Sequence, residues 1–279
     1  MLEVLAEIPS PSSSSVSLGP LEIRAYGVAI ALGVLAAVEL SRRRWQAMGH
    51  NPDEMSSIFL WAVPAGLIGS RIYHVITDYQ RFQGHWGDAV KIWEGGLGIP
   101  GGIIGGVGVG VYLGWRRGMP LAEGLDAIAP ALPLAQAIGR LGNWFNQELY
   151  GEPTDLPWAL EIDPEHRVTG LETQETFHPT FLYESLWNLA LVGFLLWIDR
   201  RRVLRPGRLI AVYVAGYGLG RLWIEALRVD PASQIAGVRV NIWVSLLALV
   251  GGLGFIVFGG IRSRDRAEPD PKTAEVPTD

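Results

Sequence analysis

The sequence predicts an all-α integral membrane protein with seven transmembrane helices, an external N-terminus, a cytoplasmic C-terminus and a small extracytoplasmic cap. Apolar runs recur along the 279 residues, and several are about 20 residues long, enough to cross a hydrocarbon core of roughly 30 Å. Arginine clusters follow alternate runs, and such clusters are retained on the cytoplasmic side. The apolar runs lie near residues 21–41, 56–77, 95–115, 120–140, 183–198, 207–225 and 241–260.

The basic clusters determine the predicted orientation of the chain. They are short and lie beside the predicted spans, so we attribute them to membrane topology rather than to nucleic-acid binding. Their members are Arg42–Arg44, Arg116 and Arg117, Arg200–Arg202 with Arg205 and Arg208, and finally Arg262, Arg264 and Arg266.

Composition agrees with a membrane domain and excludes several kinds of site. The chain is 49% hydrophobic and only 18% charged, which is less charge than a soluble domain of this size carries. It has no cysteine, so disulfides, thiolate metal sites and a cysteine nucleophile are excluded within the chain. The histidines are scattered without metal-ligand spacing, and we expect neither a metal nor another cofactor.

The two ends of the chain differ from the spans between them. Residues 1–20 lack the basic start and apolar core of a cleaved signal peptide, and we interpret them as an external leader. Residues 141–182 mix proline, glycine, tryptophan and charges, and we expect them to form the cap. Residues 261–279 are rich in proline and acidic residues, which predicts a disordered cytoplasmic tail.

The third and fourth runs are unusual for membrane spans. Residues 95–114 hold ten glycines and Pro100, which predicts close helix packing and an irregular outer end. The fourth run contains Asp126, Pro130 and Gln136, so we expect it to face the interior of the bundle. The fifth, sixth and seventh runs are more regular.

A polar stretch follows the fourth run at the predicted external face. It offers a guanidinium from Arg140, carboxamides from Asn143 and Asn146, and a carboxylate from Glu148. Arginine binds anionic oxygens in a bidentate manner, and carboxamides orient hydroxyl groups. A helix end that is simply capped by asparagine and anchored by arginine would carry the same residues, and composition alone leaves both interpretations open.

Further arginines are predicted at a similar depth. Arg221 and Glu225 lie four residues apart on one helix face, and Arg228 follows one turn later. The pair alone would be explained by mutual neutralisation. Arg71, Arg140 and Arg221 together exceed what anchoring needs, and they indicate a pocket that opens outward and suits a phosphate.

The start of the fifth run adds His178 and Glu184 on that side. A histidine at this position could carry a proton, although an interfacial histidine is more often structural. Glu184 could merely pair with an arginine. Tyr26, at the outer end of the first run, would ordinarily be an interface anchor.

These residues resemble the signature of the prolipoprotein diacylglyceryl transferases, a family of bacterial membrane enzymes. The longest matching string is Gly139-Arg-Leu-Gly-Asn-Trp-Phe-Asn-Gln-Glu148. The resemblance covers about residues 20–260 and implies that residues 21–260 form a seven-span transferase domain. The other matching pieces are Tyr26-Gly27, Gly69-Ser-Arg71, Gly95-Gly96-Leu97, Gly101-Gly102, His178-Pro179-Thr180, Tyr183-Glu184, Arg221 with Glu225, and Arg228-x-Asp230.

The resemblance implies transfer of a diacylglyceryl group from phosphatidylglycerol to the thiol of a lipobox cysteine in a prolipoprotein, with release of glycerol-1-phosphate. The implied partners are phosphatidylglycerol and the prolipoprotein signal peptide, and the implied location is the bacterial inner, or plasma, membrane. The thiol needs activation because its ordinary pKa is about 8.5 and the thiolate is the nucleophile.

The resemblance also implies roles for individual residues. Catalytic roles fall to Arg140 and Arg221 on the phosphate, to Asn143 on a glycerol hydroxyl, to Glu148 beside the guanidiniums, and to His178. Substrate-binding roles fall to Tyr26, Arg71, Asn146, Gly151, Glu225 and Arg228.

One departure leaves the general base open. Many family members have a histidine before the paired glycines of the third run, and this chain has Pro100 there. The base could be His178, Glu148 or Glu225, the arginine field could suffice, or the leaving phosphate could take the proton. Two other functions stay open, namely a transporter or binding protein for an anionic lipid or solute, and a structural or receptor-like protein.

Overall fold

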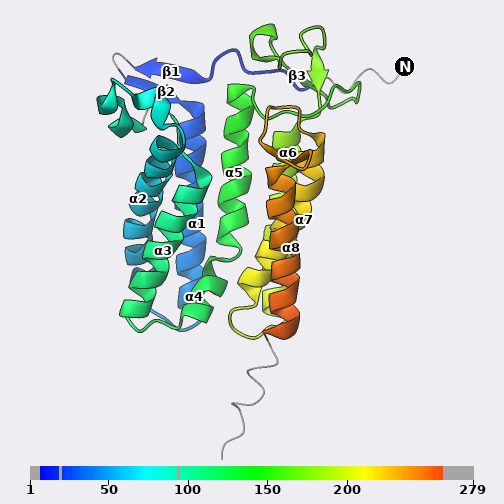
Figure 1. The fold of residues 1–279 in the computed structure, drawn as a ribbon. Helices are drawn as coiled ribbons and strands as arrows, with labels where there is room; N and C mark the ends of the chain where they lie inside the picture. Colours follow the sequence, from blue (N-terminus) through cyan, green and yellow to red (C-terminus); the bar gives the residue numbers. More distant parts are fainter. Residues whose placement is uncertain (1–6, 19–20, 93–94, 260–279) are drawn as a thin grey trace, which may run out of the picture.

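The computed structural model describes residues 7–18, 21–92 and 95–259. The predicted tail 261–279, its three arginines and the first six residues of the leader lie outside the described residues. What is described is a bundle of α-helices with small two-stranded sheets at one end (Figure 1). The all-helical class that the sequence predicts is therefore confirmed.

The helices follow the predicted apolar runs. Four of those in the described residues, α1, α2, α6 and α8, are long and apolar enough to cross a membrane. The seven-span arrangement stays a prediction, because α3 is diluted by glycine and α7 carries Arg221 and Glu225. The helices are α1 (Ala25–Ala47), α2 (Pro52–Thr77), α3 (Ile99–Arg116), α4 (Leu121–Ile128), α5 (Ala131–Asn146), α6 (Thr180–Arg200), α7 (Leu209–Leu227) and α8 (Val240–Phe258).

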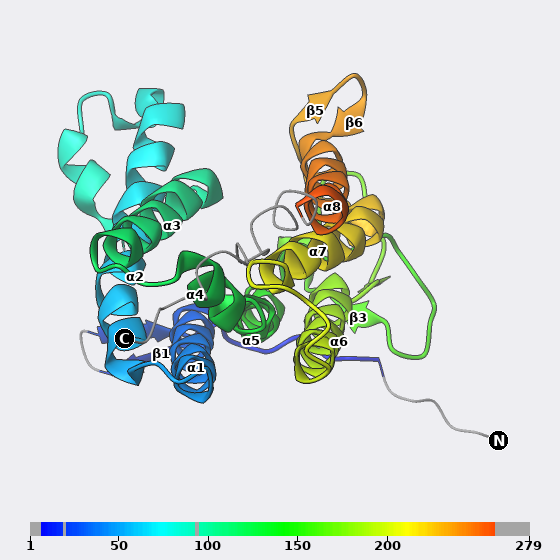
Figure 2. The same cartoon turned by 90° about the horizontal axis from the view of Figure 1, so that it is seen from below.

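The bundle has two outer helix pairs joined by a central group. Figure 2 shows α2 with α3 on one side and α7 with α8 on the other; α4 and α5 lie between them, α1 lies beside α2, and α6 lies beside α7. Helix α5 packs against both α1 and α6, so it connects the two halves. The polar stretch that ends α5 is therefore placed centrally.

Glycines bring α2 and α3 into close contact, as the glycine-rich third run predicts. A β-carbon on Gly69 would lie against the carbonyl oxygen of Gly101 and 3.3 Å from Cα of Gly105. Gly66 likewise lies close to Gly102 and Gly106. In a membrane bundle, where burial of apolar groups does not drive helix association, such close approach supplies the packing energy.

The fourth predicted span is two helices rather than one. Helix α4 ends at Ile128 and α5 begins after Pro130, because proline has no N–H to continue the ladder and its ring clashes with the preceding turn. Arg44 satisfies the freed end of α4: its guanidinium donates to the carbonyl oxygens of Asp126 at 3.0 Å and Ala127 at 3.1 Å. A cationic donor is well suited to those carbonyls.

The interior position that the sequence predicts for this segment is confirmed at Asp126. Its buried carboxylate accepts hydrogen bonds from the backbone N–H of Gly207 at 2.6 Å and of Ile210 at 3.0 Å. These groups lie at the start of α7, where a carboxylate satisfies unpaired N–H groups and complements the helix dipole. Asp126 thereby ties α4 to α7.

The small sheets gather at the end of the bundle opposite the basic clusters (Figure 1). Each is an antiparallel pair, β1 with β2, β3 with β4, and β5 with β6. The strands are β1 (Ser15–Leu18), β2 (Leu21–Arg24), β3 (Leu160–Glu161), β4 (Thr176–Phe177), β5 (Gln234–Ile235) and β6 (Val238–Arg239); 3-10 turns are η1 (Tyr79–Phe82), η2 (Trp86–Val90) and η4 (Pro164–His166).

Residues 141–182 have an apolar core of their own. Tyr150, Leu160 and Phe177 are buried together beside Ile162 and Phe181. The N-terminal segment joins this core, since Ile8 forms a parallel β-bridge with Leu160. The indole N–H of Trp144 donates to the carbonyl of Pro9 at 3.1 Å. The leader and the cap therefore form one unit over the end of α5.

We expect Gly69→Ala to lower the thermal stability of the purified protein, because the added methyl group has no space between α2 and α3. Overpacking of this kind costs about 1–3 kcal/mol. Gly108→Ala is the matched control, since nothing lies within 4 Å of its β-carbon position and helix propensity favours alanine by about 1 kcal/mol. Equal melting temperatures for the two variants in detergent would contradict the packing argument.

Candidate functional site

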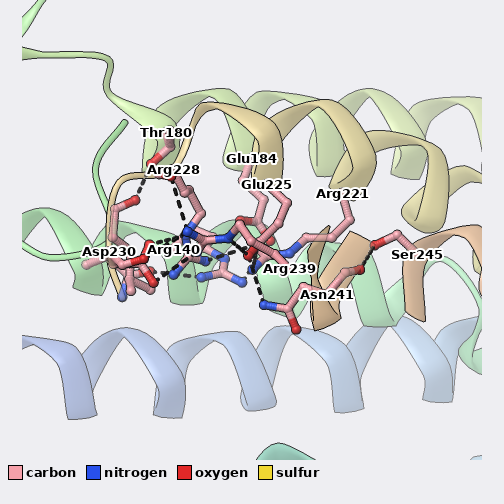
Figure 3. Close-up of polar contacts among 12 residues, drawn as sticks. Arg140, Thr180, Glu184, Arg221, Glu225, Arg228, Asp230, Arg239, Asn241 and Ser245 are labelled. Atoms are coloured by element: carbon pink, nitrogen blue, oxygen red, sulfur yellow. Dashed lines mark hydrogen bonds and ion pairs between the residues drawn. The ribbon is translucent and has the colours of Figure 1, made fainter. Parts of the chain in front are cut away.

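Glu184 joins two arginines that come from different helices. Its carboxylate lies 2.8 Å from Nη2 of Arg140 on α5, and it accepts a hydrogen bond of 2.9 Å from Nη1 of Arg221 on α7. Glu184 itself is on α6 and only 4% exposed. Figure 3 shows the three side chains meeting between their helices. One buried carboxylate thus holds two guanidiniums side by side.

Helix direction explains why these residues meet. Arg140 and Arg221 lie in the last two turns of α5 and α7, whereas Glu184 lies in the first two turns of α6. Because α6 runs opposite to α5 and α7, these turns lie at the same end of the bundle (Figure 1). The position at one depth that the sequence predicts for Arg140 and Arg221 is confirmed.

A second carboxylate, Glu225, extends the network. It is fully buried and lies 2.6 Å from Arg221 Nη2 and 3.8 Å from Arg228 Nη1. It also accepts hydrogen bonds from Arg239 at 2.7 Å and from Asn241 at 3.0 Å. A carboxylate is stable at such a site only when cations and hydrogen-bond donors surround it.

Asp230 closes the network outside the helices. It accepts a hydrogen bond of 2.6 Å from Arg228 and lies 3.2 Å from Arg239. Burial alone would raise the pKa of this carboxyl group. The hydrogen bond and charge of Arg228, with the charge of Arg239, outweigh burial and hold the pKa of Asp230 below its ordinary value.

The two central arginines keep donors for a ligand. A guanidinium has five N–H donors. Among the described residues, Arg140 directs one nitrogen to Glu184 and one, at 3.3 Å, to Asn143, while Arg221 serves Glu184 and Glu225. Their side chains are 21% and 11% exposed. The remaining donors can bind an anionic oxygen, which is the chemistry of a phosphate site.

The polar stretch after Arg140 is a small hydrogen-bonded unit. The amides of Asn143 and Asn146 both donate to one oxygen of Glu148, at 2.8 and 3.0 Å. Glu148 therefore holds the two carboxamides, whereas the resemblance implied that it holds guanidiniums. Asn143 accepts from Arg140 through its other amide atom, so the orientation of the unit is linked to the arginine.

A strained turn presents this unit. Gln147 and Leu149 are non-glycine residues with positive φ, at 51° and 62°. Such conformations cost energy and persist where the surroundings hold them. Gln147 is buried and bonded twice to Asp163 of the cap, at 2.6 and 2.8 Å, and the Thr180 hydroxyl bonds the Leu149 carbonyl. The sequence shows no local sign of this role for Gln147.

Gly151 lies where three chain segments converge. Its N–H donates to the carbonyl of His178 at 2.9 Å, and the next N–H, of Glu152, donates to that of Leu227 at 2.8 Å. A β-carbon at Gly151 would lie 2.9 Å from His178 and 3.0 Å from Thr180. Only glycine fits this crossing without displacement of its neighbours.

The structure places the other predicted site residues nearby or elsewhere. Tyr26 packs on Gly142 and lies within electrostatic range of Arg140 and Glu148. His178 lies beside Gly151, and its Nδ1 is 3.1 Å from the hydroxyl of Tyr183. Neither residue contributes an ion pair to the arginine network in the described structure.

Arg71 is not brought into this network. Its guanidinium donates to the backbone carbonyls of Asp88, Ala89 and Gly95 at 2.5, 2.8 and 2.5 Å, and to that of Gly96 at 3.1 Å. It lines a separate polar cavity beside α2. Its observed role is to hold the segment that leads into α3, and a role in substrate binding stays a prediction.

Sequence reasoning missed part of the site. Glu184 appeared only as a possible partner of an arginine, although it is the centre. Arg239 and Asn241 were not identified. A signal for Arg239 did exist, because a lone arginine just before the last span, on the predicted external side, is unexpected for an anchoring residue. No group of three His, Asp or Glu residues able to hold a metal occurs in the described part of the chain.

Comparison with known proteins places the chain among relatives of a single kind. A family model described as prolipoprotein diacylglyceryl transferase matches residues 13–258. Three relatives named phosphatidylglycerol–prolipoprotein diacylglyceryl transferase illustrate the similarity. That of Streptomyces griseus is 51% identical over 91% of this chain and 78% of its own length. Those of Frankia alni and Corynebacterium efficiens are 53% and 52% identical, over 90% and 91% of this chain and 67% and 82% of their own lengths.

The lowered pKa of Asp230 predicts a pH-dependent contribution to stability. A carboxyl group whose folded pKa lies below its unfolded value, about 3.9, stabilises the fold above that value and loses this effect as pH falls through the folded pKa. We expect Asp230→Asn to have a lower melting temperature than the wild type near neutral pH. The difference between the two melting temperatures should narrow below about pH 4. A difference that stays constant over this range would contradict the assignment.

Proposed function

This chain belongs to the prolipoprotein diacylglyceryl transferase family, and we propose that Arg140, Glu184 and Arg221 mark the place where phosphatidylglycerol binds and reacts. The chain transfers the diacylglyceryl group of phosphatidylglycerol to a prolipoprotein, the first step of lipoprotein maturation. The acceptor is the thiol of the lipobox cysteine. The observation that supports this site is the single buried carboxylate that holds guanidiniums from two separate helices.

The reaction is a displacement at carbon by sulfur. The thiolate attacks the glycerol carbon that carries the phosphate, a carbon–sulfur bond forms, and the carbon–oxygen bond breaks with its electron pair on oxygen. Glycerol-1-phosphate leaves. The substrate supplies the nucleophile, which agrees with a chain that has no cysteine. Catalysis therefore requires stabilisation of the negative charge that develops on the leaving phosphate.

Arg140 and Arg221 provide that stabilisation in the proposed mechanism. Glu184 fixes both guanidiniums before the lipid arrives, so little reorganisation is needed when charge develops. Glu225 holds Arg221 from the other side. Arg228 acts indirectly, because it lies beside Glu225 and helps to neutralise it. Asn143 and Asn146, oriented by Glu148, face the glycerol hydroxyls of the head group, and Tyr26 positions it.

We assign the thiol proton to an oxygen of the leaving phosphate, with the arginine field favouring the thiolate. Pro100 cannot accept a proton. Glu225 is surrounded by cations and an amide donor, which opposes its protonation. Glu148 already accepts two amide hydrogen bonds. His178 is the alternative to the phosphate among the candidate bases, since an imidazole can accept a proton near neutral pH.

The proposed site also orients the protein in the membrane. We place the N-terminus, the cap of residues 141–182 and the arginine network on the external side of the bacterial inner, or plasma, membrane, with seven spans and a cytoplasmic C-terminus. The basic clusters at the opposite end of the bundle support this orientation. The lipid and the signal peptide then reach the network from the external half of the bilayer.

We expect Arg140→Ala and Arg221→Ala each to reduce transfer by about 10²–10³-fold, the usual effect of losing one donor to developing charge. Arg140→Lys should recover only part, because an ammonium lacks the fork that binds two oxygens. Arg43→Ala, at an exposed position at the opposite end of the bundle, is the matched control. Transfer of labelled diacylglycerol to a lipobox peptide measures the effect, and near-normal rates in both alanine variants would reject the site.

The proton assignment predicts a pH–rate profile without an enzyme group that titrates near neutrality. We expect His178→Gln to keep most of the activity and the shape of the profile. Loss of activity in that variant, with phosphatidylglycerol binding intact, would instead identify His178 as the base.

A further inference from the structure

Asn188 of α6 is a buried side chain without partners. The residue has no exposed surface, and neither Nδ2 nor Oδ1 forms a hydrogen bond. Buried polar side chains nearly always find a partner, and each exception calls for an explanation. A carboxamide that lacks both partners offers one donor and one acceptor to a ligand.

Helix geometry places Asn188 directly inward of the ion-pair layer. It follows Glu184 by four residues, so both lie on one face of α6, about 6 Å apart along the axis. The same face continues through Leu191 and Leu195, which pack against Leu209 of α7. Asn188 therefore faces the junction of α6 with α5 and α7, one turn deeper than the proposed phosphate site.

A second unpaired amide lies in the corresponding turn of α5. Gln136 precedes Arg140 by four residues and shares its helix face. Its Oε1 is buried without a hydrogen-bond partner in the described structure. Both α5 and α6 thus carry unpaired amide atoms one turn inward from the ion pair between Arg140 and Glu184.

We propose that Asn188, with Gln136, binds the peptide backbone of the prolipoprotein just before its reacting cysteine. This rests on the proposed function, because the arginine layer then marks the depth of the thiol. A signal peptide descends into the membrane on the N-terminal side of that cysteine. An extended chain advances about 3.3 Å per residue, so one helical turn deeper corresponds to the first or second residue before it.

The chemistry of a backbone peptide group fits these amides. It supplies an N–H to the unpaired oxygens and a C=O to Nδ2 of Asn188, whereas a lipid ester offers acceptors alone. An extended peptide in the membrane must pair its backbone groups with protein. Backbone contacts also carry little side-chain preference, which suits an enzyme that modifies many preproteins.

The closed arrangement is compatible with this role. Binding requires α5 and α6 to separate enough to admit the peptide. Separation breaks the hydrogen bond from the Ser185 hydroxyl to the carbonyl of Ala137, which links α6 to α5 at this layer. The unpaired atoms of Asn188 and Gln136 lose no hydrogen bond and gain partners from the peptide.

The test uses the full-length protein with phosphatidylglycerol and a lipobox peptide. We expect Asn188→Leu, which is similar in size, to raise the apparent KM for the peptide about two- to tenfold, the effect of one or two hydrogen bonds. The KM for phosphatidylglycerol should stay unchanged. The melting temperature should not fall, since the change removes unpaired buried groups.

A modified peptide makes the assignment specific. Replacing the amide bond before the cysteine by an ester should raise the apparent KM of the wild type for the peptide. The increase should be smaller for Asn188→Leu. Ser185→Ala is the matched control, because its buried hydroxyl already donates to the carbonyl of Ala137 at 2.9 Å. For Ser185→Ala, the ratio of the KM values for the ester and amide peptides should be the same as for the wild type.

Three results would overturn the inference. The first is an increased KM for phosphatidylglycerol alone, which would assign the amides to the lipid. The second is an unchanged KM for both substrates. The third is an equal increase of the KM of Asn188→Leu, relative to the wild type, with the amide and the ester peptide. If Asn188→Leu fails to insert, Gln136→Leu applies the same measurements to the second amide. Failure of the wild type to modify the ordinary peptide would reject the proposed function instead.

Discussion

The structure depends on the sharing of one desolvated carboxylate between two helices. Glu184 is nearly excluded from solvent, and such a charge persists only when cations neutralise it. Arg140 and Arg221 supply this from α5 and α7, so the ion pairs hold three helices at one depth. The same contacts orient the guanidiniums, which still have donors to spare. Neutralisation and ligand binding are thus served by one arrangement.

The rest of the fold supports that arrangement. The break between α4 and α5 is stabilised by Arg44 and Asp126, which connect α4 with α1 and α7. The strained turn after α5 is held by Gln147 and the cap. Both ends of the segment that carries Arg140 are therefore fixed by hydrogen bonds to distant residues. Preorganisation of this kind is what stabilisation of a leaving phosphate requires.

The outer helix pairs have a different character. Helices α2 and α3 join through glycine, and Arg71 holds the segment between them through backbone carbonyls. No ion pair ties this pair to the arginine network in the described residues. The two halves meet chiefly through α1 and α5. The glycine-packed half can therefore shift against the half that carries the arginine network without breaking an ion pair of that network.

Sequence alone determined the class of protein, the helical runs, the shared depth of Arg140 and Arg221, and the family, because these follow from local composition, spacing and a contiguous signature. Tertiary structure decided which charges meet. Glu184, Arg239 and Asn241 join the site through helices far apart in the chain, and Arg71, at similar depth, does not. An apolar pattern shows which residues of a helix are buried, but it does not show which neighbouring helix each face will meet. That is decided only when the helices pack into the bundle.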